Sequence, residues 1–178
     1  MRKLSLFIAC SLDVYIAKNN DDLSFLSTVE KEGEDYEYGK FTNEIDTIII
    51  GRKTFDYVEK NIGIAHYDQP GRRVFVITSV LRPNVGNIHF TNVPINELVE
   101  ELKNQEGKGI YCDGGAQIID ALLQYDMIDE MIISIVPILL GEGTRLFKDH
   151  RPEQVLEFIS SKSFDTGLVQ LHYKRKRI

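Results

Sequence analysis

The chain has 178 residues, 43% of them hydrophobic and 27% charged, a composition that predicts one folded domain of ordinary size over residues 1–178. Its net charge of −6 argues against nucleic acid or an anionic membrane as a partner, because both bind positively charged surfaces. Only two cysteines are present and no apolar run approaches the length of a membrane span, so we expect a cytoplasmic protein without a disulfide framework.

Hydrophobic patterning predicts strands and helices that alternate along the first two thirds of the chain. The predicted strands cover residues 4–9, 46–50, 73–78, 87–90 and 108–112. The predicted helices are a short stretch from residue 23 and the segments 36–43, 54–59, 95–104 and 117–124. Residues 61–72 are expected to form a long irregular connection, of the kind that often borders a binding site.

The last third of the chain changes character, with an apolar run at 130–139 and two strands at 156–164 and 168–174 joined by a turn. Alternating strands and helices followed by consecutive strands predict an α/β fold, whose central sheet is mainly parallel and ends in antiparallel strands. The basic residues 174–177 lack interleaved aromatic side chains beyond Tyr173, so we interpret them as a solvated strand end.

Two glycine-marked turns lie where an apolar strand gives way to a predicted helix. The residues of the first turn are Gly51, Arg52, Lys53 and Thr54. The residues of the second turn are Gly114, Gly115, Ala116 and Gln117. A helix N-terminus has unpaired N–H groups and a positive dipole end, and glycine allows close approach of the backbone, so each turn is a candidate phosphate site.

Either turn alone is weak evidence, because Arg52 and Lys53 could face water and the paired glycines could serve packing. Their joint occurrence is more informative, since parallel strands bring their carboxyl-end turns to one edge of a sheet. Two phosphate-sized sites at one edge suit a dinucleotide. The spacing matches neither the common three-glycine dinucleotide fingerprint nor a P-loop.

Five motifs in order carry a resemblance to a known family. They are SLD and YIA within residues 11–17, IGRKTF at 50–55, VFVITS at 74–79, GGAQI at 114–118 and PILLGEG at 137–143. With these motifs the chain resembles the dihydrofolate reductase superfamily, in particular the reductase domain of bacterial riboflavin biosynthesis. The resemblance implies a three-layer αβα fold, NADPH as cofactor and a homodimer.

The resemblance also implies roles for the turns. The segment 51–54 would receive NADPH phosphates, including the ribose 2′-phosphate, for which the Arg52 fork and the Lys53 point charge are chemically suited. The segment 114–117 would lie beneath the pyrophosphate. Thr78 and Ser79 would lie near the adenosine half, although the same residues could simply terminate a strand.

On the substrate side the candidates come from the first strand and the segments that follow it. Asp13 is the first candidate proton donor, with an Asx turn as its alternative role, and Asp22 is the second. The side chains expected to wall a flat heterocycle, if they are not plain core, are Tyr15, Phe25 and Phe55. By resemblance, Gly141 lies in a turn that borders the nicotinamide.

Two departures from the family pattern bear on activity. Val14 replaces a glycine, which restricts the positive φ available to the substrate loop, and Ser24 replaces a family aspartate. We therefore expect an NADPH-dependent reductase that moves a hydride to a C=N or C=O carbon of a small heterocycle. The closest activities would be reduction of 5-amino-6-(5-phosphoribosylamino)uracil or of dihydrofolate.

The alternative is a nucleotide-binding or regulatory protein that retains the cofactor cleft without turnover. The four histidines show no metal-ligand spacing, so no metal is expected.

Overall fold

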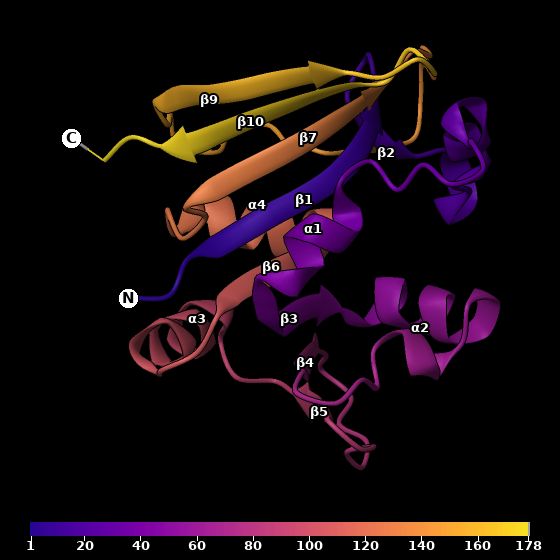
Figure 1. The fold of residues 1–178 in the computed structure, drawn as a ribbon. Coiled ribbons are helices and arrows are strands. Elements are labelled where there is room, and N and C mark those ends of the chain that lie inside the picture. Colours follow the sequence, from indigo (N-terminus) through magenta and orange to yellow (C-terminus); the bar gives the residue numbers. More distant parts are fainter. Residues whose placement is uncertain (178) are drawn as a thin grey trace.

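A mixed sheet of eight strands forms the centre of the protein, seen in a computed structural model in which residues 1–177 are described (Figure 1). In spatial order its strands are β5 (Ile88–Thr91), β4 (Arg73–Ile77), β3 (Ile45–Gly51), β6 (Gly109–Gly114), β1 (Leu4–Ser11), β7 (Glu130–Val136), β10 (Val169–Arg175) and β9 (Leu156–Ser163). The first six run parallel to one another, and β10 is antiparallel to both β7 and β9. This arrangement confirms the predicted α/β class with a parallel sheet and an antiparallel C-terminal edge.

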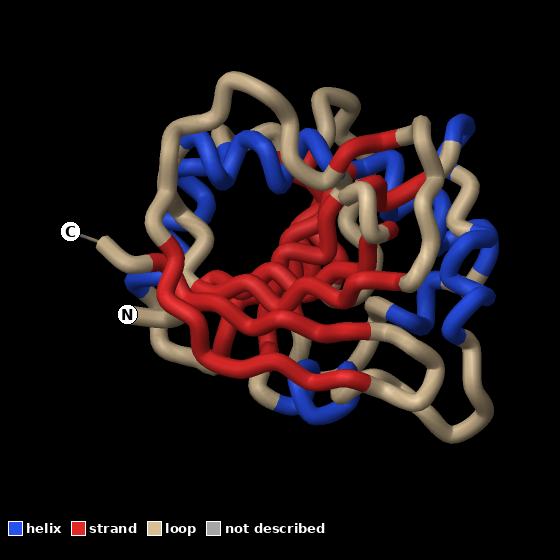
Figure 2. Tube along the Cα trace, turned by 90° about the horizontal axis from the view of Figure 1, so that it is seen from above, coloured by secondary structure: helices blue, strands red, loops and turns tan. Residues whose placement is uncertain are grey.

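Helices cover both faces of this sheet, as the view from above shows (Figure 2). On one face α1 (Tyr38–Asn43) and α2 (Arg52–Asn61) pack on the sheet, and on the other α3 (Ile95–Asn104) and α4 (Ala116–Gln124) do so. In α3 the buried apolar side chains recur at helical spacing, which is why a predicted helix with the same bounds forms here. The side chains that set this spacing are Ile95, Leu98, Val99 and Leu102.

Differences from the sequence prediction lie at element ends and in short elements. The apolar run at 130–139 is a strand only as far as Val136, because Pro137 cannot donate a ladder hydrogen bond. The stretch after residue 23 is the 3₁₀ helix η2 (Ser24–Val29), and two further 3₁₀ turns are η1 (Asn19–Asp21) and η3 (Ile64–His66).

A small ribbon of β2 (Tyr15–Ala17) and β8 (Thr144–Arg145) was not predicted, since such short strands carry too little pattern.

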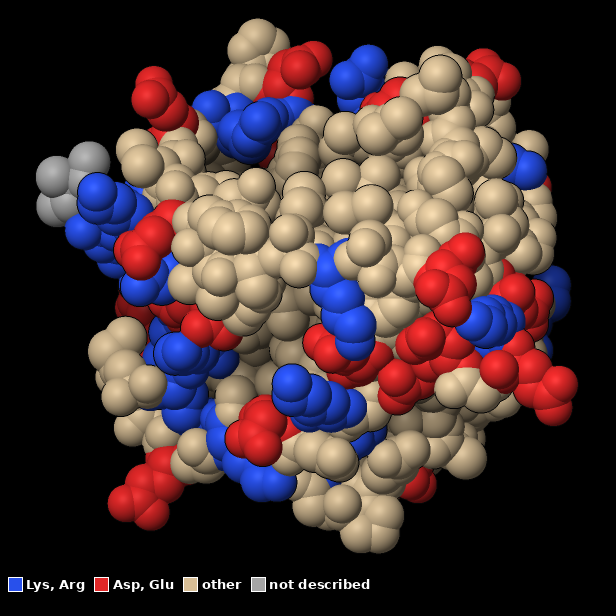
Figure 3. Space-filling model, turned by 45° about the horizontal axis from the view of Figure 1, so that its top comes forward, with Lys and Arg blue, Asp and Glu red and all other residues tan. Residues whose placement is uncertain are grey.

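The basic C-terminal residues support β10 through ion pairs. Arg175 Nε lies 2.5 Å from Asp126 Oδ1, and Arg177 Nη1 lies 2.8 Å from Asp129 Oδ1. In Figure 3, basic and acidic side chains are interspersed around an uncharged area. In residues 1–177, no helix is long and apolar enough to cross a bilayer.

The aromatic ring of Phe55 lies in the core beneath α2. It is 0% exposed, stacks on Tyr67 at 5.9 Å between ring centroids, and meets Phe90 edge to face at 5.5 Å. Phe25 is also core, 2% exposed and packed with Val136. Their positions favour the plain-core interpretation over a role in walling a heterocycle.

We expect Phe55→Ala to lower the free energy of unfolding by roughly 3–5 kcal/mol, because a buried ring is replaced by a cavity. The exposed Lys60, on the same helix, provides the control, since Lys60→Ala should change stability by no more than about 0.5 kcal/mol. Urea denaturation followed by circular dichroism measures both. A loss below about 1 kcal/mol in Phe55→Ala would contradict the packing described.

Candidate functional site

The two glycine turns meet at one edge of the sheet because β3 and β6 are adjacent and parallel. A Cβ atom on Gly51 would lie 3.6 Å from both the Gly114 carbonyl oxygen and the Gly115 nitrogen, so the two corners are in direct contact. Helix α2 starts directly after Gly51 and α4 directly after Gly115, and neither N-terminus is capped by a side chain. Both helices therefore direct free N–H groups and positive dipole ends to one place.

An outer groove of 480 Å³ runs over these two corners. It is lined by all of the predicted cofactor residues except Gly114, which lines the neighbouring inner cavity. The predicted residues in the groove are Gly51, Arg52, Lys53, Thr54, Thr78, Ser79, Gly115, Ala116 and Gln117. The structure thus brings together residues that are as far apart in the sequence as 51 and 117.

Cations dominate the charge of the outer groove. Arg52, Lys53 and Lys148 line it, together with the carboxylate of Asp21. Arg52 Nη1 lies 2.7 Å from Asp56 Oδ2, and Arg82 pairs with the other oxygen of Asp56. In a protein with net charge −6, this local excess of cations makes the groove a candidate site for an anion.

The inner cavity of 360 Å³ adjoins the outer groove and extends toward β1 and η2. The residues that line both spaces are Asp21, Lys53, Thr54, Gly115, Ala116 and Thr144. The walls of the inner cavity are largely apolar. They include Phe7, Ile8, Ala9, Ile16, Leu23, Leu26, Tyr57, Val58, Ile62 and Tyr111. An apolar cavity with few polar groups, opening from an anion groove, is typical of a site for a flat organic ligand.

Asp113 is the acidic group in the inner part of this cavity, at the carboxyl end of β6. Its carboxylate accepts hydrogen bonds from the hydroxyls of Tyr111, at 2.5 Å, and of Tyr67. Burial raises the pKa of Asp113 above its ordinary value, while the two tyrosine hydrogen bonds act in the opposite direction. A raised pKa brings this carboxyl closer to the range in which it can donate a proton.

The carboxylates predicted as catalytic lie elsewhere. Asp13 accepts hydrogen bonds from Ser11 Oγ at 2.5 Å and from the N–H groups of Leu140 at 3.0 Å and Gly141 at 2.7 Å. The Ser11 bond, with the two backbone bonds, lowers the pKa of Asp13 to about 2. Asp22 accepts the N–H of Ser24 at 2.7 Å. Neither lines the groove or the cavity, and the carboxylate of each is used to bind backbone N–H groups.

The predicted substrate-binding side chains also lie outside the lining of both spaces. Tyr15 is 8% exposed, and its hydroxyl donates to the Gly141 carbonyl at 3.3 Å. Val14 adopts a φ of 68°, a left-handed conformation that a β-branched side chain disfavours, so the loop after β1 is strained at this residue.

Four of the polar lining residues that sequence reasoning missed bear on the chemistry of the site. Asp113 and Asp21 are acidic, and Thr144 and Lys148 reach the groove from the segment after β7. For Asp113 a signal existed, because it is a charged residue directly after three buried strand residues. For Lys148 no sequence signal existed, because it reaches the groove only through the folding of a distant segment of the chain.

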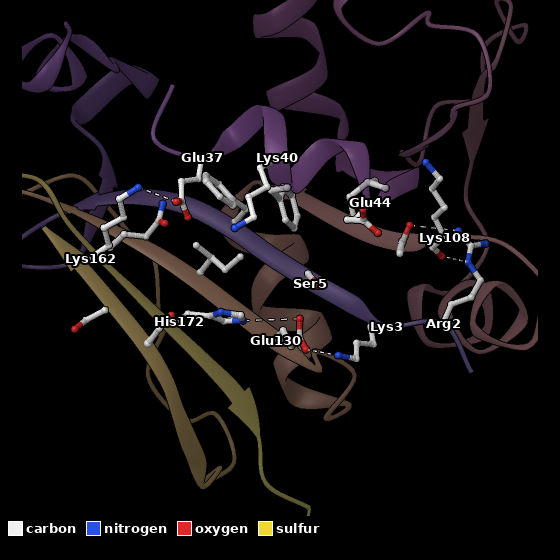
Figure 4. Close-up of a pocket in the computed structure, with 18 of the residues that line it drawn as sticks. Arg2, Lys3, Ser5, Glu37, Lys40, Glu44, Lys108, Glu130, Lys162 and His172 are labelled. Carbon is white, nitrogen blue, oxygen red and sulfur yellow. Dashed lines mark hydrogen bonds and ion pairs between the residues drawn. The ribbon is translucent and has the colours of Figure 1, made fainter. Parts of the chain in front are cut away.

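A larger hollow of 780 Å³ lies against α1 and the start of β1, away from the glycine turns (Figure 4). Two of its lysines are paired, with Lys3 Nζ 2.5 Å from Glu130 and Lys162 Nζ 2.7 Å from Glu37, and neither glycine turn lines this hollow. Size alone therefore does not make it the functional site. Nowhere in residues 1–177 do three or more His, Cys, Asp or Glu side chains gather as metal ligands.

We expect the pKa of Asp13 in the folded protein to be near 2 and to rise in Ser11→Ala, because the main hydrogen bond to the carboxylate is lost. A group with a lowered folded pKa stabilises the fold above its unfolded pKa of about 3.9 and loses that effect as pH falls toward 2. Asp13→Asn should thus destabilise at pH 7 but not at pH 2. Carboxyl ¹³C NMR titration gives the pKa, and a wild-type value near 4 would contradict this geometry.

Comparison with known proteins places the chain among reductase-like domains. It is 34% identical over 174 residues to the uncharacterised protein YwjB of Bacillus subtilis (strain 168), with 98% of each chain covered. A candidate riboflavin biosynthesis protein from Shewanella sp. PV-4 is similar in structure, with a TM-score of 0.85 at 29% identity, covering 98% of this chain and 99% of that one.

The dihydrofolate reductase of Enterococcus faecalis, in a complex with NADP(H), has a TM-score of 0.68 at 17% identity, over 98% of this chain and 97% of that one. At this identity the similarity shows the fold, and it confirms the dihydrofolate reductase-like architecture. The model of the RibD C-terminal domain matches residues 2–170. The chain therefore belongs to the RibD C-terminal domain family.

Proposed function

We propose that the protein is an NADPH-dependent reductase of a small heterocycle. The observation that carries this proposal is that the two glycine corners line one cationic groove, which opens into an apolar cavity containing Asp113. A hydride-transferring enzyme needs a dinucleotide site directly beside the site of its flat acceptor, and the groove and the cavity are adjacent in this way. Membership in a family of reductase-like domains supports the same conclusion.

The residues of the groove fit NADPH. A Cβ on Gly51 would lie 3.0 Å from the Ile118 side chain, and a Cβ on Gly115 would lie 2.9 Å from Thr54 Oγ1, so glycine at these positions lets the two corners pack against each other and face one groove. The N-termini of α2 and α4 would bind the phosphates, and Arg52 and Lys53 would bind the ribose 2′-phosphate. Thr78 and Ser79, at the end of β4, would contact the adenosine half.

NADPH when bound supplies a hydride to an electrophilic carbon of a C=N or C=O bond. The chain's own residues would do the rest. The apolar walls formed by Ile8, Ile16 and Leu26 exclude water and position the acceptor ring. The Asp113 carboxyl gives a proton to the nitrogen or oxygen of the reduced bond and recovers it from solvent, with Tyr67 and Tyr111 fixing its orientation.

The substrate classes we propose are pteridine- and pyrimidine-like compounds, with dihydrofolate and 5-amino-6-(5-phosphoribosylamino)uracil as starting candidates. A protein that binds the nucleotide without turnover is the second candidate, motivated by the strained Val14 and by Ser24. Spectrophotometric NADPH oxidation with these acceptors separates the two, because the second candidate predicts binding without oxidation.

We also propose that the protein is cytoplasmic and forms a homodimer. Cys10 and Cys112 are buried free thiols, which supports a reducing cytoplasm. The interface of the homodimer that the resemblance implies would include Phe158 and Ile159, two exposed apolar side chains of β9.

Arg52→Ala should reduce the preference for NADPH over NADH, because a charge-assisted contact with the 2′-phosphate worth about 2 kcal/mol is removed. Calorimetric titration of both cofactors measures the preference. Lys60→Ala, on the exposed side of the same helix, is the control and should leave it unchanged. An unchanged preference in Arg52→Ala would remove Arg52 from this role.

Asp113→Asn should lower kcat by about 10²- to 10⁴-fold, the usual contribution of a positioned general acid, with little change in NADPH affinity. Asp13→Asn is the matched comparison, because it alters the other candidate carboxyl. Steady-state kinetics of the two variants, with 7,8-dihydrobiopterin or dihydrofolate as acceptor, distinguish the two candidate proton donors. A larger loss in Asp13→Asn than in Asp113→Asn would return the proton-donor role to Asp13.

A further inference from the structure

The connection between α2 and β4 brings one side chain into contact with Asp113. Tyr67, which follows η3, is 1% exposed, and its hydroxyl donates a hydrogen bond to Asp113 Oδ2. Among residues 1–177, this carboxylate oxygen is the one hydrogen-bond acceptor of the Tyr67 hydroxyl. The irregular connection at 61–72 therefore supplies a fixed donor to the acidic group of the inner cavity.

The Tyr67 side chain is held in place by contacts outside the cavity. Its ring stacks on Phe55, and the backbone around it is bound by Asn87. Asn87 Nδ2 lies 3.2 Å from the carbonyl oxygen of Tyr67, 3.0 Å from that of Gln69 and 2.7 Å from that of Arg72. The direction of the Tyr67 hydroxyl is thus set by the fold before any ligand binds.

Tyr111 approaches the other oxygen of Asp113 and has a choice of acceptor. It lies two residues before Asp113 on β6, so both side chains are on the same face of the strand. The Tyr111 hydroxyl is 2.5 Å from Asp113 Oδ1 and 3.2 Å from the carbonyl oxygen of Phe7, on the adjacent strand β1. Because a hydroxyl has one proton, Tyr111 can release Asp113 and donate to Phe7 instead.

The two tyrosines also differ in their position relative to the cavity. Tyr111 lines the inner cavity, whereas Tyr67 does not. Of the two carboxyl oxygens, Oδ1 is thus next to a residue of the cavity wall, and Oδ2 is next to a residue behind it. Burial and the charge of Asp113 raise the pKa of both tyrosines above its ordinary value, so both hydroxyls remain donors at neutral pH.

Resting on the proposed function, we infer that Tyr67 is a positioning residue that confines the transferable proton of Asp113 to Oδ1. Tyr67 donates to Oδ2 in both protonation states of Asp113, since the described residues offer it no second acceptor. When Oδ1 carries the proton, Tyr111 donates to the Phe7 carbonyl.

The proton transfer then takes place at Oδ1. The nitrogen or oxygen of the reduced bond holds the electron pair of the former double bond and uses it to bind the proton. The O–H bond of Asp113 breaks, and its electrons stay on Oδ1. Tyr111 turns back from Phe7 and donates to the ionised Oδ1 until the carboxyl is protonated again.

The two hydroxyls therefore affect the pKa of Asp113 unequally. Tyr67 binds the ionised carboxyl more strongly than the protonated one, because a charged acceptor strengthens a hydrogen bond, and so it opposes the effect of burial on this pKa. Tyr111 gives up its bond to Phe7 when it binds the ionised carboxyl, and it can accept from the protonated one. Loss of the Tyr67 hydroxyl should thus raise the pKa of Asp113 more than loss of the Tyr111 hydroxyl.

Other titratable and charged groups surround Asp113 without hydrogen bonds to it within residues 1–177. They are His66 beside Tyr67, Tyr38 of α1, and Asp21, Lys53 and Tyr57 of the cavity lining. A protonated His66 lowers the pKa of Asp113 through its charge. Burial raises the pKa of Tyr38 to about 12, so Tyr38 is neutral when Asp113 titrates.

The test is a carboxyl ¹³C NMR titration of Asp113 in the protein without ligands, with the signal assigned by its loss in Asp113→Asn. We expect Tyr67→Phe, which keeps the ring on Phe55, to raise the pKa of Asp113 by about one pH unit. Tyr111→Phe should raise it by less. An unchanged pKa in Tyr67→Phe, or an equal or larger rise in Tyr111→Phe, would overturn the inference.

Tyr57→Phe is the matched control for the titration, because Tyr57 also lines the cavity but its hydroxyl makes no hydrogen bond to Asp113 in the part of the chain that the structure describes. It should leave the pKa of Asp113 unchanged. A rise as large as that in Tyr67→Phe would reflect a general effect of lost hydroxyls and contradict the specific role of Tyr67.

The pH dependence of kcat, with NADPH and dihydrofolate, tests the consequence for the reaction. Protonated Asp113 is the active form, so kcat falls as pH rises through its pKa, and in Tyr67→Phe this fall should move to higher pH. A lower kcat with an unmoved fall would indicate a merely structural role and contradict the inference. If the wild-type protein oxidises no NADPH, the proposed function is contradicted, while the NMR titration still decides the role of Tyr67.

Discussion

Contact between the carboxyl ends of β3 and β6 is the constraint on which the site depends. Only glycine at position 51 allows this approach without displacing Ile118, and a Cβ at position 115 would press on Thr54 Oγ1 at 2.9 Å. Because the strands are parallel neighbours, the helices that follow them start side by side. Two helix N-termini, each with unpaired N–H groups, then act on the same small volume.

The side chains that line the site differ between the outer groove and the inner cavity. The outer groove concentrates Arg52, Lys53 and Lys148 in a protein that is acidic overall. The inner cavity is apolar, and its Asp113 has a pKa raised by burial. An anionic cofactor and a flat acceptor can thus bind next to one another.

The sequence predicted the parallel sheet and the two glycine turns because both depend on local signals. Strand periodicity located β3 and β6, and glycine after each strand located the turns. The partners of Asp13 could not be predicted, since Leu140 and Gly141 lie 127 and 128 residues away in the chain. Phe25 and Phe55 could not be assigned either, because an aromatic residue in an amphipathic segment can face a core or a ligand space. Asp113 can be recognised in the sequence as a charged residue near the end of a buried strand, but the direction of its side chain depends on the register of β6 in the sheet.

The most direct test of the central claim is an NADPH titration followed by ¹H–¹⁵N NMR of the backbone amides at the two corners. If the corners bind one cofactor, the amide signals of Arg52 and Lys53 and those of Ala116 and Gln117 will shift together and saturate with one dissociation constant. A response at one corner alone, or two different dissociation constants, would contradict a single shared site.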